Sequence, residues 1–344
     1  MPSKKSNVLL IYTGGTIGMI TDKYSGALHN FQLDQLMRYI PEMKQANCTM
    51  DSYTFSPPID SSDMEPKIWV RLAKIIADNY DKHDGFVILH GTDTMAYTAS
   101  ALSFMLSGLN KPVILTGSQL PIGALRTDGK ENLLTSIEIA ATKIDGHAAV
   151  PEVCIFFEHK LLRGNRTIKL QAENFNAFRS YNHPRLADCG IDINYNFESI
   201  LPYKSGKVLV PQTTMCQDVV ILKLFTGIQE HVVNAILNIP HLKGVVLESF
   251  GSGNAPQKAW LIEAVRKATL KGIVIINITQ CLQGSVQMER YATGLHLSQA
   301  GVVSGADMTT ESAITKLMFL FGQGLQADDV RTKMVESIAG EISC

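Results

Sequence analysis

The sequence lacks the spacings that are typical of metal sites and redox motifs. Its six cysteines are scattered and form no Cys-x-x-Cys pair, and its nine histidines include no His-x-x-x-His pair. Most zinc sites and redox motifs are recognised by paired spacings of this kind. We therefore expect no metal and no other cofactor. We interpret Cys154, which lies in an apolar run, as a small core residue.

The sequence also lacks a long apolar run and an excess of either charge. No apolar run reaches the length of about 20 residues that spans a membrane. The net charge of -1 excludes the basic excess of a nucleic-acid-binding surface. The first apolar run begins at residue 8, too soon for a signal peptide. We predict a cytoplasmic protein that binds neither nucleic acid nor membranes.

What the sequence does contain, near its start, is an apolar run followed by glycines and a threonine. Residues 8–12 predict a buried strand, and Gly14, Gly15 and Thr16 follow it. Glycines allow a sharp turn close to a ligand, and ligands of open α/β sheets bind at the carboxyl ends of the strands. Thr16 is therefore a candidate nucleophile that needs a neighbouring base. The alternative is that Thr16 caps a helix.

The pattern of strand, glycine turn, hydroxyl residue and helix recurs further along the chain. Residues 86–89 predict a strand that leads into His-Gly-Thr-Asp-Thr at 90–94. Residues 112–115 predict another, followed by Thr-Gly-Ser-Gln at 116–119. Successive units of this kind predict a parallel sheet with right-handed crossovers. Their loops then lie on one edge of the sheet, where neighbouring loops converge.

A second α/β series in the later part of the chain indicates a second domain. Its predicted strands lie at 219–224, 244–247 and 273–278, with a helix at 260–270. The proline-containing stretch before it is irregular and suits a linker. We predict an α/β fold with a mostly parallel sheet flanked by helices in each of two domains. The predicted boundaries are 1–196 for the first domain, 197–216 for the linker and 217–344 for the second domain.

Two further segments supply polar side chains. Asp60, Ser61 and Ser62 precede a predicted helix at 66–80, and they either cap that helix or bind a ligand carboxylate. The segment Arg-Gly-Asn-Arg-Thr-Ile-Lys ends at Lys169 and is positively charged. It is either part of a site or a solvated hairpin.

Together these motifs resemble those of the bacterial-type L-asparaginases, in particular the cytoplasmic type I group. The similar segments are Tyr-Thr-Gly-Gly-Thr-Ile-Gly at 12–18, Asp-Ser-Ser-Asp-Met at 60–64, Leu-His-Gly-Thr-Asp-Thr at 89–94, Arg-Gly-Asn-Arg-Thr at 163–167 and Gly-Ser-Gly-Asn-Ala-Pro at 251–256. The resemblance covers nearly the whole chain. It implies a two-domain asparaginase-like fold, no cofactor, a role in amino-acid catabolism and a homotetramer built from tight dimers.

The resemblance also implies the chemistry. Thr16 attacks the side-chain amide of L-asparagine, ammonia leaves, and water hydrolyses the resulting β-aspartyl ester to L-aspartate. Thr92, Asp93 and Lys169 match the family's second triad, in which the Lys–Asp pair holds the threonine hydroxyl and orients the water. The Lys169 ammonium favours the charged form of Asp93. Thr92 and Asp93 also count among the substrate-binding residues.

Three more residues and two tyrosines follow from the resemblance. Asp60, Ser61 and Ser62 match the positions that hold the α-carboxylate of the substrate and neighbouring groups. The tyrosine that assists the nucleophile has two candidates. Tyr24 lies on the loop after Thr16, although the usual glycine–tyrosine pair is replaced there by glycine–alanine, and Tyr291 lies in Arg-Tyr-Ala-Thr-Gly.

A possible allosteric site departs from the family pattern. Some type I asparaginases are activated by asparagine at a second site, with an arginine before the Gly-x-Gly-Asn turn and a Thr-x-Cys segment on a later strand. Thr279, Gln280 and Cys281 match that segment, but Glu248 stands where the arginine would be. A glutamate repels a ligand carboxylate, which an arginine binds. We expect weak or absent activation unless Lys243 or another residue substitutes.

Two alternative functions remain open at this point. One is the ammonia-producing subunit of a tRNA-dependent amidotransferase, which normally has an added amino-terminal domain, whereas the first strand here begins near residue 8. The other is a non-catalytic amino-acid-binding protein on the same scaffold, which we expect to have lost Thr16, Thr92 or Lys169. All three residues are present.

Overall fold

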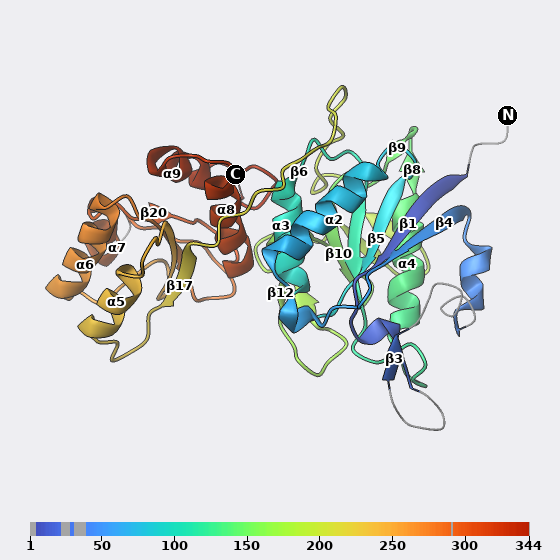
Figure 1. Cartoon of the computed structure of the whole chain (residues 1–344), viewed down its shortest axis with the longest axis horizontal. Helices are drawn as coiled ribbons and strands as arrows, with labels where there is room; N and C mark the ends of the chain where they lie inside the picture. Colours follow the sequence, from blue (N-terminus) through green and yellow to red (C-terminus); the bar gives the residue numbers. More distant parts are fainter. Residues whose placement is uncertain (1–4, 22–27, 31–38, 290–291, 344) are drawn as a thin grey trace. The chain divides into compact units, whose positions relative to one another are not determined.

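The apolar runs that predict strands are parallel neighbours in two sheets (Figure 1). The computed structural model describes residues 5–21, 28–30, 39–289 and 292–343. These divide into two units, Met1–Thr213 and Thr214–Cys344. The predicted fold class, a mostly parallel sheet flanked by helices in each half of the chain, is confirmed. The predicted domain and linker boundaries stay a prediction.

The sheet of the first unit has eight strands, in the order β15-β14-β11-β10-β7-β5-β1-β4. Its parallel part consists of β1 (Ser6–Tyr12), β4 (Cys48–Thr54), β5 (Gly85–Leu89), β7 (Val113–Thr116) and β10 (Val153–Phe157). The antiparallel strands β11 (Lys160–Arg163), β14 (Ala187–Cys189) and β15 (Ile193–Tyr195) extend one edge. Strands β5, β7 and β10 are buried along their whole length, which explains their continuous apolar sequences. Cys154 is fully buried in β10, as predicted.

Helices cover both faces of this sheet. Helices α2 (Pro66–Asp78) and α3 (Met95–Met105) lie on one face, and α4 (Gly129–Ala141) lies on the other (Figure 1). Side chains of β5 alternate accordingly, since Phe86 stacks on Tyr80 after α2 while Val87 belongs to the cluster that contains Leu133 of α4.

The positions of these helices correct the predicted handedness of the crossovers. The connections from β4 to β5, from β5 to β7 and from β7 to β10 all step in the same direction across the sheet. Crossovers that step the same way on opposite faces have opposite hands, so the connection through α4 differs in hand from those through α2 and α3. The prediction that all crossovers are right-handed is therefore wrong.

The second unit contains a four-stranded parallel sheet with helices around it. The strands are β17 (Val219–Lys223), β18 (Gly244–Ser249), β19 (Val274–Thr279) and β20 (Val303–Ser304), in that order. The helices are α5 (Glu230–Leu237), α6 (Ala259–Leu270), α7 (Ala292–Gln299), α8 (Thr310–Gly322) and α9 (Ala327–Val335). Its core includes Leu247, Val265 and Ile275.

A buried ion pair fixes the end of the second unit. Lys316 of α8 and Glu341 are both fully buried, and Lys316 Nζ lies 2.6 Å from Glu341 Oε1. The same carboxylate accepts hydrogen bonds from the backbone N–H groups of Ile338 and Ala339. Burial lowers the pKa of Lys316, because desolvation disfavours its charged form.

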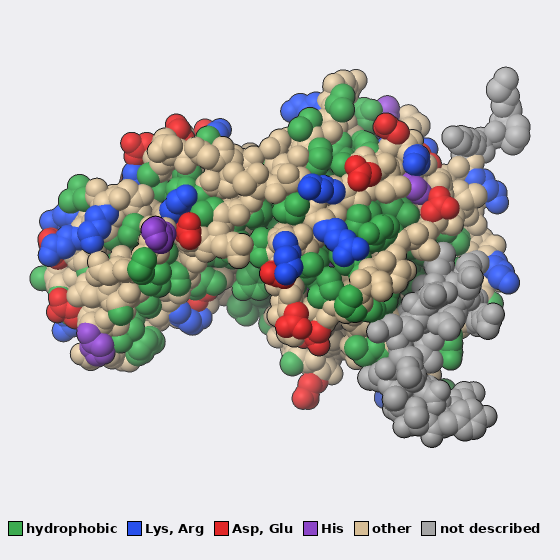
Figure 2. Space-filling view, viewed as in Figure 1, with side chains coloured by type: hydrophobic (Ala, Val, Ile, Leu, Met, Phe, Trp, Pro, Cys, Tyr) green, Lys and Arg blue, Asp and Glu red, His purple; other side chains and the backbone are tan. Residues whose placement is uncertain are grey.

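On the face that Figure 2 shows, charges of the two signs are not segregated. Figure 2 shows basic and acidic side chains interspersed over the visible face of both units, in agreement with the net charge of -1. Within the described ranges, no helix has both the length and the apolar character needed to cross a bilayer.

Candidate functional site

Three loops meet at the carboxyl edge of the parallel sheet in the first unit. Strands β1, β5 and β7 are neighbours, so the segments that follow them emerge side by side. The backbone N–H of Thr13 donates to Leu89 O (3.0 Å), and that of His90 donates to Thr116 O (2.9 Å). The predicted convergence of these loops on one edge is confirmed.

Glycines bring the loops into backbone contact. Gly15 has a φ of 88°, and a Cβ atom there would lie 2.5 Å from Gly91 Cα. A Cβ atom on Gly91 would lie 2.4 Å from Ser61 Oγ. Any larger residue at Gly15 or Gly91 would therefore push the loops apart, and Gly15 also needs the left-handed conformation that glycine adopts freely. The segments around Thr16, Ser61 and Thr92 are fixed to one another.

Thr16 does not cap a helix. It is the first residue of a 3-10 helix, η1 (Thr16–Gly18), whose N-cap is Gly15 and which has no side-chain cap hydrogen bond. The Thr16 side chain is half-buried, and its hydroxyl makes no hydrogen bond to any residue that the structure describes. The capping alternative is therefore wrong, because the N-cap of this helix is Gly15.

The structure brings Thr92, Asp93 and Lys169 together. Lys169 Nζ donates to Thr92 Oγ1 (2.9 Å) and lies 2.6 Å from Asp93 Oδ1. Lys169 ends β12 (Ile168–Lys169), which pairs with β13 (Phe178–Arg179). The Lys169 side chain is only 19% exposed, whereas that of Asp93 is 64% exposed, so the ammonium rather than the carboxylate is the shielded partner.

Gln119 joins this cluster and was not predicted to have a role. Thr92 Oγ1 donates to Gln119 Oε1 (3.2 Å). The Gln119 amide group donates in turn to Ala172 O (3.0 Å) and Asn174 O (3.1 Å). Its position just after the glycine turn of β7 was a usable signal, since that loop was predicted to adjoin the loop of Thr92.

Asp60 and Ser62 form a local cap next to the Thr16 turn. Asp60 is the N-cap of the 3-10 helix η3 (Ser61–Asp63), and its Oδ1 accepts from Ser62 N (2.9 Å) and Ser62 Oγ (2.8 Å). These hydrogen bonds lower the pKa of Asp60. Asp60 therefore caps η3, and the predicted alternative that this segment caps α2 is wrong, because the N-cap of α2 is Glu65. Thr94 Oγ1 donates to Ser61 O (2.6 Å) and joins this segment to the loop of Thr92.

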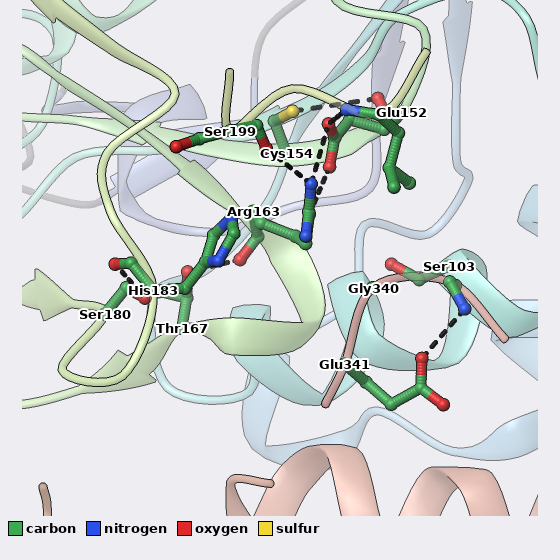
Figure 3. A network of polar contacts seen from close by, with 12 residues as sticks. Ser103, Glu152, Cys154, Arg163, Thr167, Ser180, His183, Ser199, Gly340 and Glu341 are labelled. Atoms are coloured by element: carbon green, nitrogen blue, oxygen red, sulfur yellow. Dashed lines mark hydrogen bonds and ion pairs between the residues drawn. The ribbon is translucent and has the colours of Figure 1, made fainter. Parts of the chain in front are cut away.

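The positively charged segment before Lys169 is buried. Arg163 Nε lies 2.6 Å from Glu152 Oε2, and both side chains are less than a tenth exposed. Arg163 Nη2 also donates to Ser199 O (2.7 Å), while Glu152 Oε1 accepts from Leu201 N (2.7 Å); Figure 3 shows Arg163 between Glu152 and Ser199. The solvated-hairpin alternative is therefore wrong. This buried pair anchors the chain six residues before Lys169.

A buried chain of hydrogen bonds lies behind the loop of Thr92. Trp69 Nε1 donates to Thr98 Oγ1 (3.0 Å), and Thr98 Oγ1 lies 2.9 Å from His90 Nε2. His90 Nδ1 lies 2.6 Å from Gly91 O. Burial lowers the pKa of His90 from 6.5 to about 4, so the ring is neutral. Because a carbonyl only accepts, His90 carries its proton on Nδ1 and accepts from Thr98 at Nε2.

In the second unit, Glu248 already has partners. Its carboxylate lies 2.9 Å from Lys223 Nζ and accepts from Thr310 Oγ1 (2.6 Å). The cation that pairs with Glu248 is Lys223 of the neighbouring strand β17. Gln280 Nε2 donates to Glu248 O (2.8 Å), so these residues lie together at the carboxyl ends of β18 and β19.

The other residues of the predicted allosteric segment make local contacts. Thr279 Oγ1 donates to Gly251 O (2.5 Å) and accepts from Cys281 N (3.0 Å). Cys281 is exposed. The two tyrosine candidates, Tyr24 and Tyr291, lie outside the described residues, so the structure assigns neither.

Comparison with known proteins gives matches along nearly the whole chain. The family model described as Asparaginase, N-terminal matches residues 7–201, and the model described as Glutaminase/Asparaginase C-terminal domain matches residues 218–334. L-asparaginase 1 of Escherichia coli K12 is 43% identical over 343 residues, which cover 99% of this chain and 99% of that protein. The human 60 kDa lysophospholipase is 42% identical, over 98% of this chain and 61% of that protein. Among solved structures, L-asparaginase I of Vibrio cholerae matches with a TM-score of 0.90 and 39% identity, over 99% of this chain and 100% of that one.

Proposed function

The chain belongs to the asparaginase family, and from that premise we propose that it hydrolyses L-asparagine to L-aspartate and ammonia. The family and the class of enzyme, which the sequence motifs predict, are confirmed by these matches. The observation that most supports the proposed chemistry is the contact of Lys169 Nζ with both Thr92 and Asp93. The loop that contains Thr92 and Asp93 also packs, through Gly91, against the turn before Thr16.

In the first half of the proposed reaction, Thr16 is the nucleophile. Its oxygen bonds to the carbon of the side-chain amide, the carbon–nitrogen bond breaks, and the threonine proton leaves with the nitrogen as ammonia. The product is a β-aspartyl ester on Thr16. The half-buried hydroxyl at the sheet edge, with no partner among the described residues, supports this role.

In the second half, water hydrolyses the ester. Lys169 and Asp93 hold the Thr92 hydroxyl at the sheet edge, where it orients the attacking water. Asp60, Ser61 and Ser62 bind the substrate together with the loop of Thr92; the fixed contact between Thr94 and Ser61 O supports their joint action. Binding by a preformed set of hydrogen-bond groups lowers the barrier because the groups need not reorganise during the reaction.

The experiment is an assay of ammonia released from L-asparagine by the purified protein alone. Release without a partner favours the asparaginase over the two alternatives. An amidotransferase subunit would need its partner, and a binding protein would bind without releasing ammonia. A homotetramer and a cytoplasmic location stay predictions, and light scattering after size-exclusion chromatography measures the first.

The Thr16→Ala variant tests the nucleophile. We expect turnover to fall by several powers of ten, on the order of the loss seen when a nucleophile is removed, while aspartate binding and melting temperature persist. Thr49→Ala is the matched control, since Thr49 lies on the edge strand β4 and its hydroxyl donates to Ser6 O and Asn7 Oδ1. Near wild-type turnover by Thr16→Ala would refute the assignment.

A further inference from the structure

The Thr92 hydroxyl lies between a donor and an acceptor, which determines the direction of its proton. On one side, Lys169 Nζ, which as an ammonium can only donate, lies 2.9 Å from Thr92 Oγ1. On the other side, Gln119 Oε1, which can only accept, lies 3.2 Å away. A hydroxyl has a single proton, so the hydrogen bonds run from Lys169 to Thr92 and from Thr92 to Gln119.

The orientation of the Gln119 amide is itself fixed by the backbone. Its Nε2 donates to Ala172 O (3.0 Å) and Asn174 O (3.1 Å), and carbonyl oxygens accept only, so the amide oxygen has to face Thr92. The backbone N–H of Gln119 is held as well, since both oxygens of Asp128 lie 3.0 Å from it. Gln119 therefore has one orientation rather than two.

This arrangement lies beside open space that a small molecule can enter. A cavity of about 650 Å³ is lined by Gln119, by Leu120 and Arg126 from the same loop, and by residues 172–175. The segment that accepts from Gln119 follows Lys169 directly and returns to it through the β12–β13 pair. Gln119 thus links the wall of this cavity to the Thr92 cluster.

We infer that Gln119 is a positioning residue that sets the polarity of the Thr92 hydroxyl for the water-attack half of the proposed reaction. With its proton on Gln119 and one lone pair on Lys169, Thr92 has only a lone pair left for the site. It therefore accepts a hydrogen bond from the attacking water, and the lone pair of that water is free for the acyl carbon.

The step balances without a further reactant. The water oxygen bonds to the acyl carbon of the ester, the bond between that carbon and Thr16 Oγ1 breaks, and one proton of the water ends on Thr16. Without Gln119, the hydroxyl of Thr92 can rotate so that its proton points into the site. It then donates a hydrogen bond to a lone pair of the water oxygen, and that lone pair is no longer free to attack the acyl carbon. This inference rests on the proposed function.

Two substitutions of Gln119 separate its role as an acceptor for Thr92 from its role as a donor to the backbone of Ala172 and Asn174. Gln119→Met keeps the length but removes the acceptor for Thr92 and the donors to Ala172 and Asn174. Gln119→Glu keeps an acceptor for Thr92, removes those donors and adds a negative charge. Gln323→Met is the matched control, because Gln323 also donates to two backbone carbonyls, of Thr214 (3.2 Å) and Phe319 (3.3 Å), in the second unit.

The measurement is rapid-quench kinetics of ammonia and aspartate, with and without hydroxylamine as a second nucleophile. For Gln119→Met we expect ester formation within a few-fold of wild type and ester hydrolysis slower by about 10- to 100-fold, as for other misplaced reacting groups. Ammonia then appears in a burst of one per site, and hydroxylamine accelerates turnover. Gln119→Glu should restore most of the hydrolysis rate at neutral pH, and Gln323→Met should match wild type in both steps.

Three outcomes would overturn the inference while leaving the proposed function intact. These are an unchanged hydrolysis rate in Gln119→Met, an equal loss in both half-reactions, or a Gln119→Glu variant as slow as Gln119→Met. A wild-type protein that releases no ammonia from asparagine would instead overturn the proposed function, and the inference with it. Melting temperature and aspartate binding show that each variant is folded.

Discussion

Replacing Thr98 by valine should destabilise the first unit without leaving a cavity. Valine has nearly the shape of threonine, so the change removes one hydroxyl from a site where Trp69, Thr98 and His90 are all at most 5% exposed. The Trp69 indole N–H and His90 Nε2 then both lose their partner. A buried polar group left without a partner costs about 1–3 kcal/mol. For two such groups we expect a loss of roughly 2–5 kcal/mol in the free energy of unfolding.

Urea unfolding measures this loss, and Thr98→Ser is its control. Serine keeps the hydroxyl and removes one methyl group, which costs about 1 kcal/mol. The sequence has two tryptophans, Trp69 and Trp260, so a Trp260→Phe background makes fluorescence report the first unit alone. A Thr98→Val variant that is no less stable than Thr98→Ser would refute the hydrogen-bond chain as a source of stability.

The same chain of hydrogen bonds, which ends at His90, predicts how the stability of the protein changes with pH. Burial lowers the native pKa of His90 to about 4, while the unfolded value is about 6.5. Between these values the unfolded state binds more protons than the native state. The contribution of the neutral His90 ring to the free energy of unfolding is therefore complete above pH 6.5 and is lost as the pH falls toward 4. The difference corresponds to on the order of 3 kcal/mol. His90→Asn should flatten this part of the profile, and an equally steep profile in that variant would contradict the assignment.

Three further predictions concern single charged residues. Lys169→Met should lose nearly all turnover at an unchanged melting temperature; unchanged turnover would reduce the residue to a surface ion pair. Asparagine activation should be weak or absent because Glu248 stands where the family pattern has an arginine, so the plot of rate against asparagine concentration should be hyperbolic; a sigmoidal curve that becomes hyperbolic on replacing Thr279 would contradict this. Lys316→Met leaves the buried carboxylate of Glu341 without its cation, which should lower the free energy of unfolding by about 3–5 kcal/mol. An unchanged urea midpoint, read from Trp260 fluorescence, would show that the backbone N–H groups alone stabilise the carboxylate.

The central strands were predictable because burial on both faces of the sheet requires apolar side chains at nearly every position. Strands β5 and β7 are buried on both faces, and this produces continuous apolar runs that end in glycine turns. The antiparallel strands β14 and β15 were missed, since each is only three residues long, which is too short for its alternation of apolar and polar residues to stand out. The hand of the crossover through α4 was also missed, because it depends on which face a helix packs against and not on the helix sequence.

The site was predictable as a set of residues but not as a set of contacts. Thr92, Asp93 and Lys169 were named from their motifs, and the structure brings them together. The contact of Gln119 depends on the path of a loop more than fifty residues later, which no local pattern encodes. Likewise Lys223 faces Glu248 only through the register of two parallel strands, which no local pattern encodes.

The central position of β1 has a consequence for the order in which the site forms during synthesis. This strand is made before its two neighbours β4 and β5, so the sheet pairs of Tyr12 with Thr54 and Leu89 form only after both of those residues have been made. At about 5–20 residues per second, the segment that contains Thr16 waits several seconds on the ribosome before its neighbours exist. The turn at Gly15 packs against the backbone of Gly91. The candidate nucleophile therefore reaches its native surroundings only once the strand and glycine turn before Thr92 have left the ribosome.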